Sequence, residues 1–230
     1  MAHPSDYLTS PRSQDLRQTM VDRQLRTFDV TDNEVLAAVL ATPREPFVSG
    51  HVDSLIYSDA NLLASGGQTR RRLLAPMVVA RALQQAHVAA SDRVLDVGGA
   101  GGYAAALASR LAREVVALDD DRGFVDQAEF AFKGLGLANA RAVLGDLGAG
   151  LAGEGPFDVI LLGGAVEEEP EALLAQLADG GRLLAVRAGP DSSGQMVLWE
   201  RTGDVVGSRP LFGAAAEALP AFRRKPSFAF

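Results

Sequence analysis

The stretch Arg93-Val94-Leu95-Asp96-Val97-Gly98-Gly99-Ala100-Gly101-Gly102 decides the fold of this chain. Its first five residues form a short apolar run that predicts a buried strand. The glycines that follow let the backbone turn sharply and approach a ligand, because they carry no Cβ. The alanine-rich residues 103–112 then predict a helix. This order of strand, glycine-rich loop and helix is typical of nucleotide-binding α/β proteins, and a tight turn without a ligand is the alternative.

The elements downstream of this loop alternate between strands and helices. Strands are predicted over 114–118, 140–144, 157–162 and 182–187, and helices over 124–135 and 170–177. Such alternation indicates βαβ units, a parallel sheet, and helices on both of its faces. The near-continuous apolar strands agree with a sheet that is buried on both sides. Residues 195–200 and 204–209 predict a hairpin at the sheet edge.

The predicted fold is therefore α/β: a doubly wound, mostly parallel, Rossmann-like sheet with a helical N-terminal segment and a C-terminal antiparallel hairpin. We assign residues 1–90 to the N-terminal helical segment and residues 91–230 to one compact α/β unit. Within the first segment, helices are predicted over 15–25 and 76–85. Thr31 and Glu34 form a capping box that predicts a further helix with Thr31 as its cap.

Composition excludes several classes of protein. Hydrophobic residues make up 47% of the chain, which is enough for a sizeable core. No apolar run reaches the roughly 18 residues of a membrane-spanning helix, and no secretory signal is evident. The absence of cysteine and three separated histidines predict no disulfide and no metal site. A net charge of −7 argues against general binding to nucleic acid or anionic membrane. We expect a soluble, cytoplasmic protein and leave its oligomeric state open.

Two acidic residues follow the glycine-rich loop at the ends of later strands. Asp119 ends the second predicted strand, 21 residues after Gly98, where a carboxylate accepts hydrogen bonds from ribose hydroxyls. Asp146 follows the third predicted strand and would accept a hydrogen bond from an adenine amino group. Both carboxylates should meet at one edge of the sheet. An exposed acidic turn is the alternative for Asp119, and a helix cap or a loop acid is the alternative for Asp146.

Two nucleotide cofactors fit this spacing. Residues 99–104 satisfy the G-x-G-x-x-G/A pattern of dinucleotide-binding proteins. The pattern acid-x-Gly-x-x-x-Gly, with Asp96, Gly98 and Gly102, is instead the layout of S-adenosylmethionine-dependent methyltransferases. The loop alone leaves both open.

The N-terminal half resembles the protein-L-isoaspartate O-methyltransferases. The resemblance is carried, in order, by Met20-Val21-Asp22-Arg23-Gln24-Leu25-Arg26, Pro43-Arg44-Glu45-Pro46-Phe47-Val48, Tyr57-Ser58-Asp59 and Gly67-Gln68-Thr69. Residues 93–98 with Gly102 and Tyr103 resemble the cofactor loop of that family, and the resemblance spans roughly residues 18–220. A dinucleotide-binding protein would explain none of the N-terminal run.

This resemblance implies a methyltransferase with a seven-stranded sheet, an S-adenosyl-L-methionine cofactor, and a protein or peptide carboxylate, the isoaspartyl group of damaged protein, as substrate. It places Gly98, Gly99, Gly101 and Gly102 beneath the cofactor beside Asp96, with Asp119 on the ribose and Asp146 near the adenine. It places Gln68 and Thr69 in the pocket beside the methyl donor, as the candidate catalytic residues. The N-terminal segment would cover the cofactor.

The chain departs from the family pattern, so we identify it as a divergent member. A serine of the family is missing: counting forward from Gln68 puts Arg71 at its position, and counting back from Pro76 puts Leu74 there. The middle glycine of the cofactor loop is Ala100. A different methyl acceptor, or a non-catalytic relative, therefore remains an alternative. Arg70, Arg71 and Arg72 would orient a carboxylate or phosphate, or form a solvated loop of charges.

Overall fold

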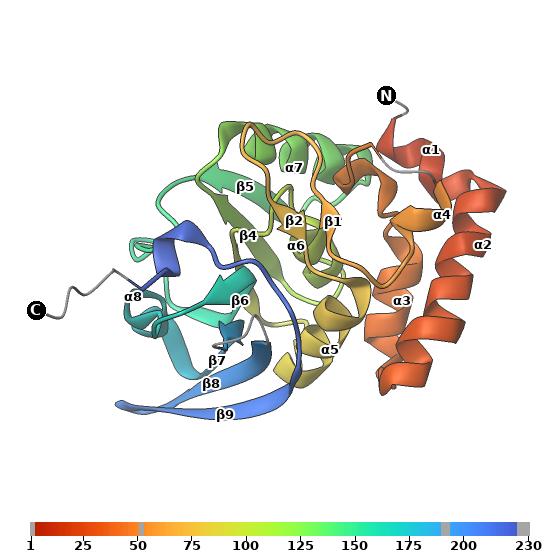
Figure 1. Ribbon diagram of the computed structural model, residues 1–230. Helices are drawn as coiled ribbons and strands as arrows, with labels where there is room; N and C mark the ends of the chain where they lie inside the picture. The colour runs from red at the N-terminus through yellow and green to blue at the C-terminus, as the bar shows by residue number, and fades with distance from the viewer. Residues whose placement is uncertain (1–2, 51–52, 190–193, 225–230) are drawn as a thin grey trace, which may run out of the picture.

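Seven strands form one sheet, in the spatial order β5-β4-β3-β6-β7-β8-β9 (Figure 1). The computed structural model describes residues 3–50, 53–189 and 194–224. The first five strands of the sheet along the chain run parallel to one another: β3 (Arg93–Val97), β4 (Glu114–Asp119), β5 (Ala140–Leu144), β6 (Phe157–Val166) and β7 (Leu177–Ala188). The prediction of a mostly parallel sheet is thus confirmed.

The last two strands form the predicted hairpin at one edge of the sheet. Strand β8 (Gly194–Thr202) pairs antiparallel with β7, and β9 (Val205–Gly213) pairs antiparallel with β8. The turn between them contains Gly203 in the left-handed region, with φ of 58°. Trp199 of β8 is 2% exposed and belongs to the core, so the hairpin is an integral part of the sheet.

Both faces of the sheet are buried, because neighbouring residues of one strand enter different cores. Val94 and Val115 belong to one core, and Leu95 and Val116 belong to the other. The first core is completed by α5 (Pro76–Ala86), α6 (Tyr103–Ala108) and α7 (Arg122–Gly134). The second is completed by the short α8 (Glu171–Leu174) and the 3₁₀ helix η4 (Pro220–Phe222). Burial on both faces explains why these strands are almost wholly apolar.

The N-terminal segment adds a layer of helices to the first core (Figure 1). Besides α5, its elements are α1 (Pro4–Thr9), α2 (Pro11–Met20), the π-helix η1 (Val21–Leu25), the 3₁₀ helices η2 (Arg26–Phe28) and η3 (Glu45–Phe47), α3 (Asn33–Ala41), α4 (Asp53–Ile56), and the paired strands β1 (Leu62–Leu63) and β2 (Arg72–Leu73). Met20, Leu25 and Leu36 are buried in the same core as α5.

The predicted cap of α3 is wrong by one residue. Asp32, rather than Thr31, precedes the first helical residue, and its Oδ1 accepts from the amides of Glu34 at 2.8 Å and Val35 at 3.2 Å. The Thr31 amide is instead bound by the Gln84 side chain at 2.8 Å. A carboxylate at the N-cap satisfies free amides of the first turn, so either residue type fits the pattern and tertiary contacts decide.

Among the described residues, the helices lack the combined length and apolar character that crossing a bilayer requires. Within the same residues, histidine and carboxylate side chains do not gather in a group of three that would suit a metal ion.

Candidate cofactor site

The glycine-rich loop follows β3 at the carboxyl end of the parallel strands. Four of its residues take left-handed backbone conformations: Gly98, Ala100, Gly101 and Gly102, with φ of 68°, 50°, 94° and 89°. Ala100 is the only one of these with a side chain, and its conformation costs roughly 1–2 kcal/mol relative to the right-handed region. The loop therefore keeps the backbone course that the glycine pattern predicts, with strain at the one position where alanine replaces glycine.

Asp96 lies directly beneath this loop and is fully buried. Its Oδ2 accepts from the Ala105 amide in the first turn of α6 at 3.2 Å, and a Cβ on Gly99 would lie 2.2 Å from that oxygen. Glycine is therefore required at position 99 for the loop to pass over the carboxylate. Burial raises the pKa of Asp96 to about 7; the Ala105 amide opposes this shift and the nearby Asp119 adds to it.

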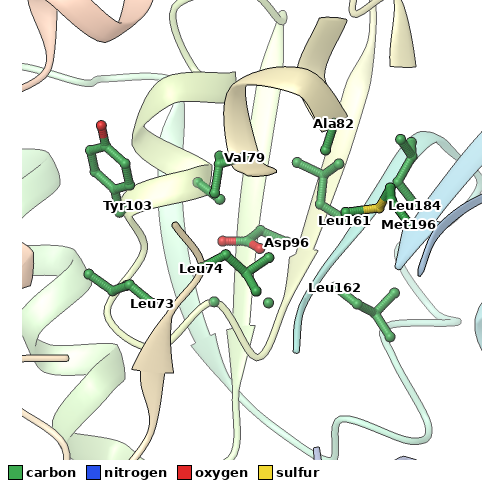
Figure 2. A pocket seen from close by; sticks show the side chains of 13 residues that line it. Leu73, Leu74, Val79, Ala82, Asp96, Tyr103, Leu161, Leu162, Leu184 and Met196 are labelled. Carbon is green, nitrogen blue, oxygen red and sulfur yellow. The ribbon is translucent and has the colours of Figure 1, made fainter. Parts of the chain in front are cut away.

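The second oxygen of Asp96, Oδ1, has no hydrogen-bond partner among the described residues. Figure 2 shows its carboxylate among apolar side chains, including Leu74 and Val79, around a cavity of about 20 Å³. Such a volume holds about one water molecule. Leu74 occupies the position that counting back from Pro76 assigned to the missing serine, so an apolar side chain borders this cavity in place of a hydroxyl.

Asp119 ends β4 as predicted, and its carboxylate is bound by an arginine. Nη2 of Arg71 contacts Asp119 Oδ1 and also lies 2.8 Å from Asp120 Oδ1. The Arg71 guanidinium lies over the Phe124 ring, 4.7 Å from its centroid. Burial raises the pKa of Asp119, and Arg71 opposes that shift. The predicted ribose acceptor is thus present at the strand end, with a cation of the same chain on it.

Three further predicted residues lie at the same edge of the sheet. Asp146 is exposed beyond the end of β5, and its Oδ1 accepts from the Ala149 amide at 2.9 Å. Gln68 and Thr69 lie at the N-terminus of α7, where the N-cap residue Asp121 accepts from the Gln68 amide at 3.1 Å and from the Thr69 amide at 2.6 Å. These bonds, with those from the Thr69 hydroxyl and the Gly123 amide, outweigh burial and lower the pKa of Asp121 to about 2.

The N-terminal run that carries the family resemblance is tied to the start of α6. Arg44 is fully buried, with its guanidinium 5.0 Å from the centroid of the Tyr103 ring. The Phe47 ring lies 5.5 Å from the same ring. Glu45 accepts from the hydroxyls of Tyr57 and Ser13, each at 2.5 Å. This run therefore packs the N-terminal segment onto the first residue after the glycine-rich loop.

Three further residues of the site were not predicted from the sequence. Asp121 is the N-cap of α7, and its side chain accepts from the Gly123 amide. An aspartate directly before a predicted helix is the sequence signal for such a cap. The sequence assigns Arg71 to the serine position, to a contact with a carboxylate or phosphate, or to a solvated loop of charges, and none of these predicts its contact with Asp119. Leu219 lies against the loop: its Cδ1 would be 3.1 Å from a Cβ on Gly98. No local pattern marks Leu219, because this contact joins residues far apart in sequence.

A seven-stranded, mostly parallel sheet with a glycine-rich first βα loop and a carboxylate at the end of the next strand defines the class I methyltransferase architecture. The family model described as Protein-L-isoaspartate(D-aspartate) O-methyltransferase matches residues 15–208. The protein-L-isoaspartate O-methyltransferase of Koribacter versatilis (strain Ellin345) is 37% identical over 187 residues, 81% of this chain and 83% of that relative. The same-named protein of Paracoccus denitrificans (strain Pd 1222) is 39% identical over 78% of this chain and 82% of the relative. The chain belongs to the protein-L-isoaspartate O-methyltransferase family.

Solved structures agree with this assignment. A protein-L-isoaspartate O-methyltransferase superposes with a TM-score of 0.79 at 25% identity, covering 88% of this chain and 65% of that chain. A Plasmodium falciparum chain, described as a beta-aspartate methyltransferase in complex with S-adenosyl-L-homocysteine, superposes with a TM-score of 0.71 at 21% identity. It covers 90% of this chain and 98% of that chain, and shows the shared fold.

The groups of the site can bind a nucleoside, but two side chains of the chain itself lie on those groups. A carboxylate at the end of β4 and an open glycine loop are the groups that bind a ribose and its neighbours. The Arg71 guanidinium and the Leu219 side chain lie on these two groups, and the cavity between them measures about 150 Å³. Ligand pockets typically measure roughly 300–1,000 Å³. Arg71 and Leu219 therefore occupy part of the space that the cofactor would need.

Proposed function

We propose that this chain is an S-adenosyl-L-methionine-dependent methyltransferase that methylates the isoaspartyl carboxylate of damaged protein. The observation that carries the proposal is the family match over residues 15–208, which includes both the N-terminal run and the glycine-rich loop. The proposal extends to a role in protein repair in the cytoplasm. A chain without cysteine is compatible with a reducing compartment.

The proposal assigns the cofactor to the carboxyl ends of β3, β4 and β5. The loop glycines, which are Gly98, Gly99, Gly101 and Gly102, would lie beneath it, with Asp96 supporting the loop. Asp119 would accept from the ribose and Asp146 would lie near the adenine. Gln68 and Thr69 would border the pocket on the side of the methyl donor, held there by Asp121. Residues 1–90 would cover the site, and residues 91–230 would form the α/β unit that binds the cofactor.

The proposed reaction requires few catalytic side chains. The cofactor supplies a methyl group on a cationic sulfur. A carboxylate acceptor is already ionised at neutral pH, so the protein need not provide a general base. What the chain must supply is orientation of the acceptor and exclusion of water. The apolar surroundings of Leu74 and the buried Asp96 support the second role.

A matched pair of peptides tests the proposal. The two peptides share one sequence and differ only in an isoaspartyl or an ordinary aspartyl linkage. With cofactor labelled in its methyl group, we expect base-labile label on the isoaspartyl peptide alone. Asp119→Asn should lower the transfer at limiting cofactor, and Asp204→Asn, on the exposed turn between β8 and β9, should leave it unchanged. Absence of label in both peptides, with cofactor binding established by calorimetry, would contradict the proposal.

A second candidate function keeps the cofactor and changes the acceptor. Leu74 favours it, because an apolar side chain borders the cavity at a position where the family resemblance implies a serine. The same labelled cofactor, offered with a panel of small carboxylates, amines and hydroxyl compounds, separates the two candidates. Transfer to a panel member, with none to the isoaspartyl peptide, would favour the second.

A further inference from the structure

Two segments that are distant in sequence lie on the groups assigned to the cofactor. One is residues 70–73, which includes Arg71 and enters β2. The other is residues 214–222, which follows β9 and returns across the carboxyl end of β6. We call them the arginine segment and the return segment. The arginine segment contacts Asp119, and the return segment contacts Gly98.

Arg71 anchors the arginine segment on the predicted ribose acceptor. The side chains of Arg71 and Asp119 are 12% and 7% exposed, so the ion pair is largely withdrawn from water. Asp120 and the Phe124 ring hold the guanidinium from two further sides. Charged hydrogen bonds in such surroundings are stronger than those at an open surface. A ribose approaching Asp119 meets a carboxylate whose Oδ1 is bound by Arg71 and by the Asp121 amide, while its buried Oδ2 has no hydrogen-bond partner among the described residues.

The return segment is hydrogen-bonded to β6 through one parallel β-bridge, between Ala165 and Ala218. The Ala165 amide donates to the Glu217 carbonyl at 2.8 Å, and the Leu219 amide donates to the Ala165 carbonyl at 3.0 Å. These bonds place the Leu219 side chain, 3% exposed, between two glycines. Its Cγ would lie 2.7 Å from a Cβ on Gly164, and its Cδ1 3.1 Å from a Cβ on Gly98. Leu219 therefore covers the face of the loop that a nucleoside would contact.

The two segments are also joined to each other. Arg72 Nε lies 3.1 Å from Glu217 Oε1, and the Asn61 side-chain amide donates to the Ala215 carbonyl at 2.8 Å. Arg72 Nη1 donates to the Asn61 carbonyl at 3.0 Å. These contacts join the two segments, and both segments line the 150 Å³ cavity.

We propose that the protein rests in a self-occupied state, in which Arg71 holds the ribose subsite on Asp119 and Leu219 covers the glycine loop, so that cofactor binding competes with Arg71. The inference rests on the proposed function. Apparent affinity then equals the affinity of the open form reduced by the fraction of molecules that are open. Arg71 thus lowers the apparent affinity for the cofactor by competing with it for Asp119, and makes no favourable contact with the bound cofactor.

Calorimetry with S-adenosylhomocysteine tests this competition, because the ligand carries no net charge at neutral pH. Arg71→Ala should bind it at least tenfold more tightly than the unaltered chain. Arg71→Gln, which retains much of the side-chain length, should show the same direction and serves if the alanine variant does not fold. Arg113→Ala is the charge-matched control, exposed at the amino end of β4, and should change the affinity less than twofold. Equal or weaker binding by both Arg71 variants overturns the inference.

Hydrogen exchange gives a second readout that does not depend on affinity. Saturating S-adenosylhomocysteine should accelerate exchange at the amides of Ala165 and Leu219, which the return segment protects, while β4 amides remain protected. Slower exchange at both amides would contradict displacement of the return segment. Failure of all variants to bind the ligand would overturn the proposed function as well. Methyl transfer to the isoaspartyl peptide, with equal affinities in all variants, would overturn only the self-occupied state.

Discussion

The carboxylate of Asp121 binds Thr69 at two points: its Oδ2 lies 2.6 Å from the Thr69 amide nitrogen and 2.7 Å from the Thr69 hydroxyl oxygen. Asp121 is also the N-cap of α7, where its Oδ1 accepts from the Gly123 amide at 2.9 Å. One side chain therefore caps a helix and fixes the loop that enters the arginine segment. The candidate catalytic residues Gln68 and Thr69 depend on it for their position.

We expect Asp121→Ala to lower the free energy of unfolding by about 2 kcal/mol, because it removes a helix cap together with the bonds to the Gln68–Thr69 loop. Thr69→Val should cost about 1 kcal/mol, since it removes only the hydroxyl bond. Urea unfolding at pH 7 measures both. Asp126→Ala, on the exposed face of α7, is the control and should change stability by less than about 0.5 kcal/mol. Equal losses in the three variants would contradict the role of Asp121.

The same residue predicts a loss of stability in acid. The pKa of Asp121 is lowered to about 2 in the folded state, against roughly 3.9 in an unfolded chain. Its contribution is therefore present above about pH 5 and is lost as the pH falls toward 2. The difference in stability between the unaltered chain and Asp121→Asn should shrink over that interval. A difference that stays constant from pH 7 to pH 3 would show that the carboxylate charge plays no part.

Asp96 should have the opposite effect on pH dependence. Its pKa is raised to about 7 when folded, so the folded state binds this proton more tightly than the unfolded state does. The resulting stability is complete below about pH 4 and is lost as the pH rises to 7. Asp96→Asn cannot ionise, so its stability advantage over the unaltered chain should grow by on the order of 2 kcal/mol as the pH rises from 5 to 8. Denaturant midpoints at the two pH values measure this gain, and a gain independent of pH would exclude ionisation of Asp96 as its cause.

Arg44 should contribute to stability mainly through packing and hydrogen bonding. Its Nη2 donates to the Leu74 carbonyl at 3.2 Å, and burial lowers its pKa, which means that its charge is costly in this position. Arg44→Ala should destabilise the protein by about 3 kcal/mol, because it leaves a cavity beside Tyr103. Arg44→Met should cost less than half as much, since it fills the volume without a buried charge. Thermal and urea unfolding measure the stability losses of the two variants, with the exposed Arg23→Ala as control. A larger loss for Arg44→Met than for Arg44→Ala would show that the charge itself is needed.

Ala100 offers a test of loop strain. At φ of 50°, a glycine relieves the left-handed conformation but gives up a buried methyl group worth about 0.8 kcal/mol. We expect Ala100→Gly to change stability by less than about 1 kcal/mol, and Ala100→Val to lower it by about 2 kcal/mol or more, because β-branched residues tolerate this region poorly. Calorimetric titration with S-adenosylhomocysteine should show tighter binding by the glycine variant. Equal stability of the glycine and valine variants would mean that the loop has changed its conformation.

Where many of the candidate site residues lie was predictable, because their placement depends on local patterns. The strand at 93–97 and the glycines after it were recognised from adjacent residues, and Asp119 was placed at a strand end by counting along the chain. Arg71 could not be placed in this way. Counting from its two flanking motifs left both Arg71 and Leu74 as candidates for one position, since the run between Thr69 and Pro76 is longer than the family pattern. The structure separates them: Arg71 lies on Asp119, and Leu74 borders the cavity beside Asp96.

The order of strands and helices, the parallel sheet and the line of acidic residues at its carboxyl edge were determined by the sequence alone, because periodicity and backbone geometry act over a few residues. Which side chains fill the space above the glycine loop was decided by tertiary structure. Leu219 reaches Gly98 only because β8 and β9 bring the chain back to the end of β6. Contacts of that kind depend on the closing of long loops and on the packing of both cores, and no short stretch of residues encodes them.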